Sequence, residues 1–141
     1  YVINELNATV TVFHYDEEAG VLSEVQTIST LPEDYAGEKS CADIHISNDG
    51  RFLYGSNRGH DSIVVCAIDQ ANGRLSPIEY VPTLGGHPRN FALSPDNRFV
   101  LVANRDSNNV VTFARDAVTG RLTPAGPELQ VSRPVCVKFM A

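Results

Sequence analysis

Short hydrophobic segments alternate with polar turns along this chain of 141 residues. In the stretch 88–131 the pattern predicts strands at 90–93, 99–103 and 110–113, and a less regular strand at 128–131. These segments are rich in Val, Phe and Leu, and clusters of Gly, Pro, Asn and Asp separate them. No segment carries apolar residues at the 3.6-residue spacing of an amphipathic helix. The pattern therefore predicts an all-β protein.

The same pattern occurs more than once. The sequence from Phe91 to Arg105 aligns without a gap on the sequence from Ile44 to Arg58, and Asn4, Asn57 and Asn104 hold equivalent positions. Offsets of 53 and 47 residues between these asparagines indicate a solenoid or a propeller. Each period is a four-stranded antiparallel meander, which must stack on copies of itself to bury its faces. We therefore predict β-propeller blades, about three blade equivalents in all, forming a partial propeller.

The repeat also predicts the domain organisation. We expect one partial β-propeller domain over 1–141, with repeats at about 1–40, 41–87 and 88–133 and a further repeat opening at 134–141. The first repeat lacks its innermost strand, and the last segment is such a strand without a blade. Either two copies self-associate and close a six-bladed ring, or missing N-terminal blades of a longer protein complete it. A start at Tyr1 without Met favours the second possibility.

Composition narrows the function. A net charge of −6 argues against sequence-independent binding of nucleic acid, which needs clustered Lys and Arg. The longest apolar runs are far too short to cross a membrane. Cys41, Cys66 and Cys136 show no metal-ligand spacing, so no metal site is expected, and we predict a reducing, cytoplasmic location. Cys41 and Cys136 are expected at the strand-entry register of Pro88.

One register position differs in charge between the repeats. In an antiparallel meander the loops alternate between two ends, and the residue after the shared Asn lies at one of them. It is Glu5 in the first repeat, Arg58 in the second and Arg105 in the third. If the three side chains converge, a carboxylate and two guanidinium groups can act as an acid/base group and an anion clamp. The alternative is an exposed ion pair that contributes little.

Four further residues are candidates for substrate binding at the same end. His45 and Asp43 alternate onto one face of an innermost strand and can line the central channel. His87 and Arg89 flank the entry of the next innermost strand. The alternatives are a histidine satisfied by its own strand neighbours and exposed side chains at a Gly/Pro turn. Arg115, on a third strand, is expected to be solvated.

Three segments resemble one known family, the lactonase-type seven-bladed propellers. They are Tyr-Val-Ile-Asn-Glu-Leu-Asn at 1–7, Cys-Ala-Asp-Ile-His-Ile-Ser-Asn-Asp-Gly-Arg-Phe-Leu-Tyr at 41–54 and Gly-His-Pro-Arg-Asn-Phe at 86–91. The family includes propeller-class 6-phosphogluconolactonases and 3-carboxymuconate cyclase, and the resemblance covers its C-terminal three blades. By motif, Glu5 and Arg58 match active-site positions of the family, and Arg89 matches another recurring arginine.

The resemblance implies a function for the parent protein. That function is hydrolysis of a small anionic sugar lactone, with 6-phosphogluconolactone as the expected substrate and no cofactor. Arg58 and Arg89 would hold the substrate while Glu5 assists the attack of water. The family's catalytic His and a further Arg would lie before Tyr1, so the chain alone is expected to be inactive. An isomerase of the cyclase type and a non-catalytic binding platform are the alternatives.

Overall fold

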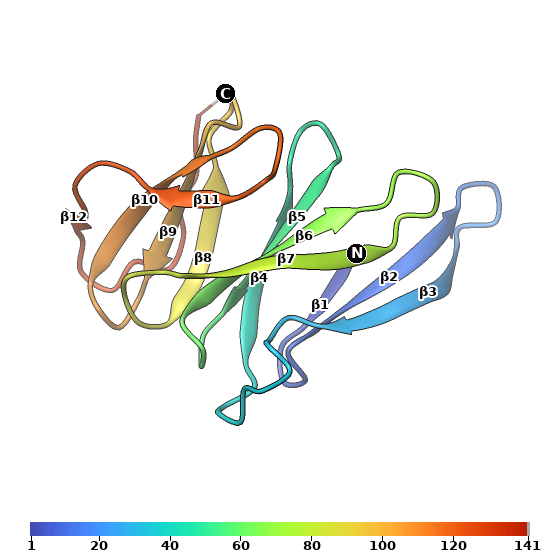
Figure 1. Ribbon diagram of the computed structural model, residues 1–141, viewed down its shortest axis with the longest axis horizontal. Coiled ribbons are helices and arrows are strands. Elements are labelled where there is room, and N and C mark those ends of the chain that lie inside the picture. The colour runs from blue at the N-terminus through green and yellow to red at the C-terminus, as the bar shows by residue number, and fades with distance from the viewer. Residues whose placement is uncertain (141) are drawn as a thin grey trace.

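The computed structural model describes residues 1–140 as strands and connecting turns in three antiparallel sheets (Figure 1). The first sheet contains β1 (Val2–Asn4), β2 (Thr9–Asp16) and β3 (Val21–Ser29). The second contains β4 (Cys41–Ile46), β5 (Phe52–Asn57), β6 (Ser62–Ile68) and β7 (Leu75–Pro82). The third contains β8 (Pro88–Leu93), β9 (Phe99–Asn104), β10 (Asn109–Arg115), β11 (Leu122–Pro124) and β12 (Leu129–Gln130). The prediction of an all-β partial propeller is confirmed.

The sheets stack face to face, and the second sheet is covered on both sides. Tyr54 on β5 faces the third sheet and packs in a cluster with Phe91 and Phe113. Its neighbour Leu53 faces the first sheet and packs with Val10 and Val12. Since consecutive strand residues point to opposite faces, a strand covered on both sides has no exposed face. All six residues of β5 are buried for this reason.

The outermost strand of the third sheet differs from its prediction. The sequence predicted one strand at 128–131. In the structure two short strands, β11 and β12, pair with β10, and only β12 lies in the predicted range. Gly126, with a φ of 72°, and Pro127 lie between the two strands. Proline has no N–H to donate to β10, so the ladder is interrupted there.

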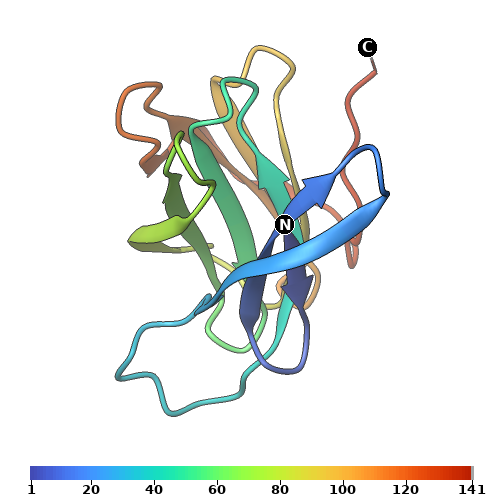
Figure 2. The same cartoon turned by 90° about the vertical axis from the view of Figure 1, so that its right-hand side faces the viewer.

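The C-terminal segment runs beside the third sheet (Figure 2). No strand is assigned to residues 134–140, and their contact with β8 includes a hydrogen bond of 2.6 Å from the N–H of Val137 to Oδ1 of Asn90. The equivalent bond one repeat earlier joins the N–H of Phe91 to Oδ2 of Asp43. Val137 is thus equivalent to Phe91, which places Cys136 at the register of Asn90. The predicted register with Pro88 is wrong for Cys136.

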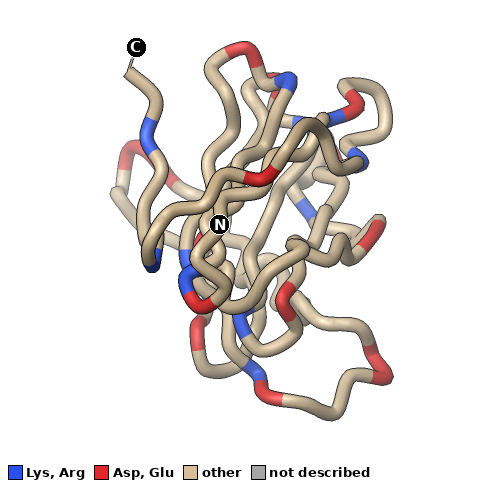
Figure 3. The backbone as a smooth tube through the Cα atoms, turned by 90° about the vertical axis from the view of Figure 1, so that its left-hand side faces the viewer, with Lys and Arg blue, Asp and Glu red and all other residues tan. Residues whose placement is uncertain are grey.

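Loops gather at two ends of the stacked sheets, and charged residues lie mainly in them (Figure 3). At one end the turns after β4 and β8 place Gly50 and Asn97 at positive φ, 68° and 57°, the conformation that these residue types tolerate. We call this the turn end. The opposite end carries the loops after β1, β5 and β9, and we call it the loop end. No helix in residues 1–140 has the length and apolar character that a membrane crossing requires.

Arg115 corrects one prediction at the turn end. Its side chain is only 3% exposed, so the expectation of a solvated residue is wrong. Its Nε donates to the hydroxyl of Tyr54 at 2.8 Å and its Nη2 to Asp49 at 3.2 Å, both on the second sheet or its turn. Arg115 therefore joins the second and third sheets. A sequence pattern does not reveal this, because the partners come from another repeat.

Candidate functional site

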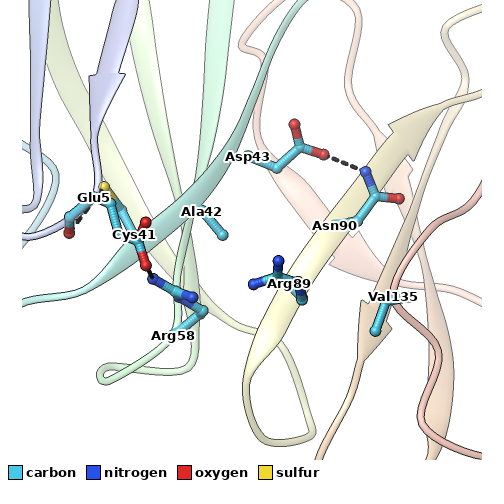
Figure 4. A pocket seen from close by; sticks show the side chains of 8 residues that line it. All are labelled: Glu5, Cys41, Ala42, Asp43, Arg58, Arg89, Asn90 and Val135. Carbon is cyan, nitrogen blue, oxygen red and sulfur yellow. Dashed lines mark hydrogen bonds and ion pairs between the residues drawn. The ribbon is translucent and has the colours of Figure 1, made fainter.

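A pocket of about 260 Å³ opens at the loop end, where the three sheets meet (Figure 4). It combines side chains from the turn after β1, from β4, from the turn after β5 and from β8, together with one residue of the C-terminal segment. The lining residues are Glu5, Cys41, Ala42, Asp43, Arg58, Arg89, Asn90 and Val135. The pocket thus contains the two residues predicted as catalytic and two of the four predicted to bind substrate.

Glu5 and Arg58 form an ion pair across the first and second sheets. Backbone hydrogen bonds fix both turns: the carbonyl of Glu5 accepts from the N–H of Cys41 at 3.0 Å, and the N–H of Arg58 donates to Ser40 at 2.8 Å. The Arg58 side chain is 9% exposed, whereas that of Glu5 is 61% exposed. The hydrogen bond from Arg58 and its charge lower the pKa of Glu5, and Arg89 adds a smaller effect. Glu5 is therefore an ionised, accessible carboxylate at neutral pH.

The two arginines of the pocket are held differently. Arg58 is buried and bonded to Glu5, but its Nε has no hydrogen-bond partner in residues 1–140. Arg89 is exposed and projects from β8 between Arg58 and Val135 in Figure 4. Within the described residues its guanidinium makes no hydrogen bond or ion pair. The pocket therefore offers a free cationic group next to an ionised carboxylate, which suits a small anionic ligand.

Asp43 and His45 lie on the same face of β4, as predicted. His45 Nε2 lies 3.1 Å from Oδ2 of Asp43, and its ring packs edge to face on Phe91 at 4.8 Å between centroids. His45 does not line the pocket, and its contacts are those of a histidine satisfied by its neighbours. Burial raises the pKa of Asp43, but hydrogen bonds from His45 and two backbone N–H groups outweigh it and lower the pKa. Asp43 is thus an ionised carboxylate whose oxygens are already bonded.

His87 lies outside this pocket. Its backbone has a φ of 59°, and its N–H donates to Oδ1 of Asp61 at 2.7 Å. Nδ1 lies 3.5 Å from Asp106, and Nε2 is buried without a partner in residues 1–140. Burial lowers the pKa of His87, and the positive charge of Arg105 adds to this. The structure therefore places a neutral histidine at the loop end, beside the pocket and not in its lining.

The three register-equivalent charges do not all converge. Glu5 and Arg58 meet, but Arg105 turns to its neighbour Asp106, with Nε 2.7 Å from Oδ1. Arg105 and Asp106 line a different hollow, together with Asn108 and Arg133. One carboxylate and two arginines do line a single pocket, but the second arginine is Arg89 and not Arg105.

Sequence reasoning missed four residues of the lining: Cys41, Ala42, Asn90 and Val135. For Asn90 a signal was present, because it follows Asp43 by the repeat offset of 47 residues and so shares its register. Burial raises the pKa of the Cys41 thiol to about 11, and its Sγ donates to the carbonyl of Asn4 at 3.0 Å. Cys41 is therefore a packed thiol and not a thiolate nucleophile. In residues 1–140 no three His, Cys, Asp or Glu side chains lie close enough to hold a metal ion.

Comparison with known proteins identifies similar sequences and structures. The family described as "Lactonase, 7-bladed beta-propeller" matches residues 1–139. The 6-phosphogluconolactonase of Bacillus subtilis is 41% identical over 140 residues, which are 99% of this chain and 40% of that protein. An uncharacterized protein of Lactococcus lactis is 48% identical over 91 residues, 64% of this chain and 27% of that protein.

Two solved structures share the fold closely. A protein from Lactobacillus plantarum superposes with a TM-score of 0.93 at 35% identity, covering 97% of this chain and 40% of that one. The periplasmic gluconolactonase of Pseudomonas aeruginosa superposes with a TM-score of 0.90 at 39% identity, covering 97% and 38%. The chain thus spans at most about two fifths of the length of these four relatives.

Proposed function

Because the chain belongs to the lactonase family of seven-bladed β-propellers, we propose that the complete protein hydrolyses a sugar lactone, with 6-phosphogluconolactone as the expected substrate. One observation carries the proposal. The ionised carboxylate of Glu5, the largely buried Arg58 bonded to it and the exposed Arg89 line a single pocket. Lactone hydrolysis calls for this combination, a carboxylate that accepts a proton beside guanidinium groups that stabilise negative charge.

Each charged group has a distinct part in the proposed reaction. Arg89 binds the anionic group of the substrate, since it is the guanidinium without a partner in the described residues. Glu5 accepts a proton from the attacking water. Arg58 orients Glu5 and stabilises the negative charge that develops on the carbonyl oxygen. The water oxygen bonds to the carbonyl carbon, the bond from that carbon to the ring oxygen breaks, and the ring oxygen receives the proton from Glu5.

Substitution of Glu5 in the complete protein tests this function. We expect Glu5→Gln to lower kcat for 6-phosphogluconolactone by about 100-fold or more, because a positioned general base contributes about that much. The matched control is Glu17→Gln, the same chemical change at an exposed turn remote from the pocket. Both variants should keep the circular dichroism spectrum of the wild type. Unchanged turnover in Glu5→Gln would remove Glu5 from the mechanism.

Location and partners remain predictions. A small anionic lactone is the expected partner. The expected cytoplasmic location concerns the complete protein, and one close structural relative is described as periplasmic. Fractionation of the source cells, with the protein detected by an antibody, would test the location.

A further inference from the structure

We propose that Asp43 is a positioning residue that joins β4 to β8 and thereby fixes Arg89 in the pocket. The inference rests on the proposed function only in so far as Arg89 is taken to bind the anionic group of the substrate. It assigns to Asp43 a role different from the substrate contact that its sequence position predicts.

The hydrogen bonds of Asp43 show that most of its carboxylate is already used within the protein. Oδ2 accepts from Nδ2 of Asn90 at 2.5 Å, from the N–H of Phe91 at 3.2 Å and from His45 at 3.1 Å. Oδ1 accepts from the N–H of Ile44 at 2.9 Å. A carboxylate has about four acceptor positions. The acceptor positions of Oδ2 and one of the two on Oδ1 therefore go to its own strand and to the next sheet, although the residue lines the pocket.

The local geometry of β8 explains why Arg89 needs this support. Pro88 pairs with Asn104 and Asn90 pairs with Ala103 on β9, so Arg89 lies at a register shift and has no paired residue there. Such a bulge can redirect a side chain, but it removes the ladder bonds that would hold the residue. The bonds from Asn90 and Phe91 to Asp43 fix the two residues that follow Arg89. The direction of the Arg89 side chain thus depends on the carboxylate of Asp43.

The next repeat contains the same type of hydrogen bond to the neighbouring backbone, but with an asparagine in place of the aspartate. Asn90 holds the register of Asp43, and its Oδ1 accepts the N–H of Val137 at 2.6 Å. An amide is therefore sufficient to bond the backbone of the neighbouring segment. The carboxylate of Asp43 in addition accepts the side-chain amide of Asn90 and the N–H of Ile44. An asparagine at position 43 has only one acceptor oxygen, so its amide donor would face one of these two donor groups. Asp43 and Asn90 form a complementary pair next to the pocket.

The test measures binding of inorganic phosphate to the complete protein by calorimetry. We expect Asp43→Asn to weaken phosphate binding about tenfold, the effect of losing roughly one charge-assisted hydrogen bond. Arg89→Gln should weaken it at least as much, and Asp43→Asn should have no further effect in the Arg89→Gln background. Independent, multiplying effects of the two substitutions would overturn the proposal, as would phosphate binding that does not depend on Arg89.

Two more variants separate positioning from general loosening. Asp43→Asn combined with Asn90→Asp exchanges donor and acceptor and should restore the affinity to within about threefold of wild type. If the double variant binds phosphate as weakly as Asp43→Asn alone, the hydrogen-bond basis of the proposal is contradicted. Asp49→Asn weakens the same pair of sheets at the turn end, and it should lower stability but leave phosphate affinity unchanged. An equal loss of affinity in Asp49→Asn would show that Asp43 has no specific role.

This readout is independent of catalysis. A wild-type protein that binds phosphate through Arg89 but hydrolyses no lactone would contradict the proposed function and leave the role of Asp43 intact. Active enzyme with phosphate affinity unaltered by Asp43→Asn would contradict only the role of Asp43.

Discussion

Two arginines lie at opposite ends of the third sheet, and they differ in exposure and in hydrogen bonding. Arg115, at the turn end, bonds Tyr54, Asn97 and Asp49 with its three nitrogens, and its side chain is 3% exposed. Arg89, at the loop end, is exposed and makes no hydrogen bond or ion pair within residues 1–140. A guanidinium with a hydrogen bond from each nitrogen holds sheets together, whereas one with no bonded nitrogen can bind a ligand.

The comparison extends to the surroundings of each residue. At the turn end the repeats use the same serine, aspartate and turn in successive blades: Ser47 bonds Asp49 at 2.5 Å, and Ser94 bonds Asp96 at 2.6 Å. At the loop end the equivalent positions Glu5, Arg58 and Arg105 differ in charge or in partner. Repetition thus accompanies the structural contacts, and variation accompanies the candidate site. This is the expected division on a repeated scaffold.

The largest effect on stability should come from Arg115→Met. This change removes three hydrogen bonds, to Tyr54, Asn97 and Asp49, and at roughly 1 kcal/mol for each bond it costs about 3 kcal/mol in the free energy of unfolding. Urea unfolding of the complete protein, followed by circular dichroism, measures the loss. Affinity for phosphate should stay at the wild-type value. A loss below about 0.5 kcal/mol would mean that Arg115 does not hold the sheets together.

A smaller effect should come from Gly85→Ala, which tests whether the loop end is also closely packed away from the pocket. A Cβ at Gly85 would overlap Ser107 Oγ and the side-chain amides of Asn104 and Asn109. Such overpacking costs about 1–3 kcal/mol. The adjacent Gly86→Ala is the matched control, because its nearest neighbours would be 3.8 and 3.9 Å away. Equal melting temperatures of the two variants would contradict the predicted packing.

The smallest effect on stability should come from Arg89→Gln. Because the guanidinium has no partner in the described residues, the free energy of unfolding should change by less than about 0.5 kcal/mol. The same variant should nevertheless raise KM for 6-phosphogluconolactone about tenfold or more, as expected when a charge-assisted contact is lost. Urea unfolding and steady-state kinetics on one preparation measure both. A destabilised variant with unchanged KM would reverse the contrast between Arg89 and Arg115.

Much of the fold could be predicted from the sequence because the repeat carries it. Apolar runs such as 99–103, turn residues such as Gly50 and Asn97, and the equivalence of Asn4, Asn57 and Asn104 are local features of the chain. Each acts through backbone conformation or through the burial of a strand. The prediction of a strand at 128–131 was only partly correct, because Gly126 and Pro127 divide the outer strand into β11 and β12. This division depends on pairing with β10, which the local pattern did not reveal.

The sequence by itself determined the stacked antiparallel sheets and the end at which charge varies, and a recognisable motif picked out Glu5, Arg58 and Arg89. Only the tertiary structure decided which of these charges meet. In it Glu5 forms an ion pair with Arg58, and Arg105 forms one with Asp106. It also used Asp43 to bind β8 and buried Arg115 between two sheets. The reason is physical: an ion pair or hydrogen bond between repeats depends on how neighbouring sheets are rotated and spaced, and no single strand encodes that relation.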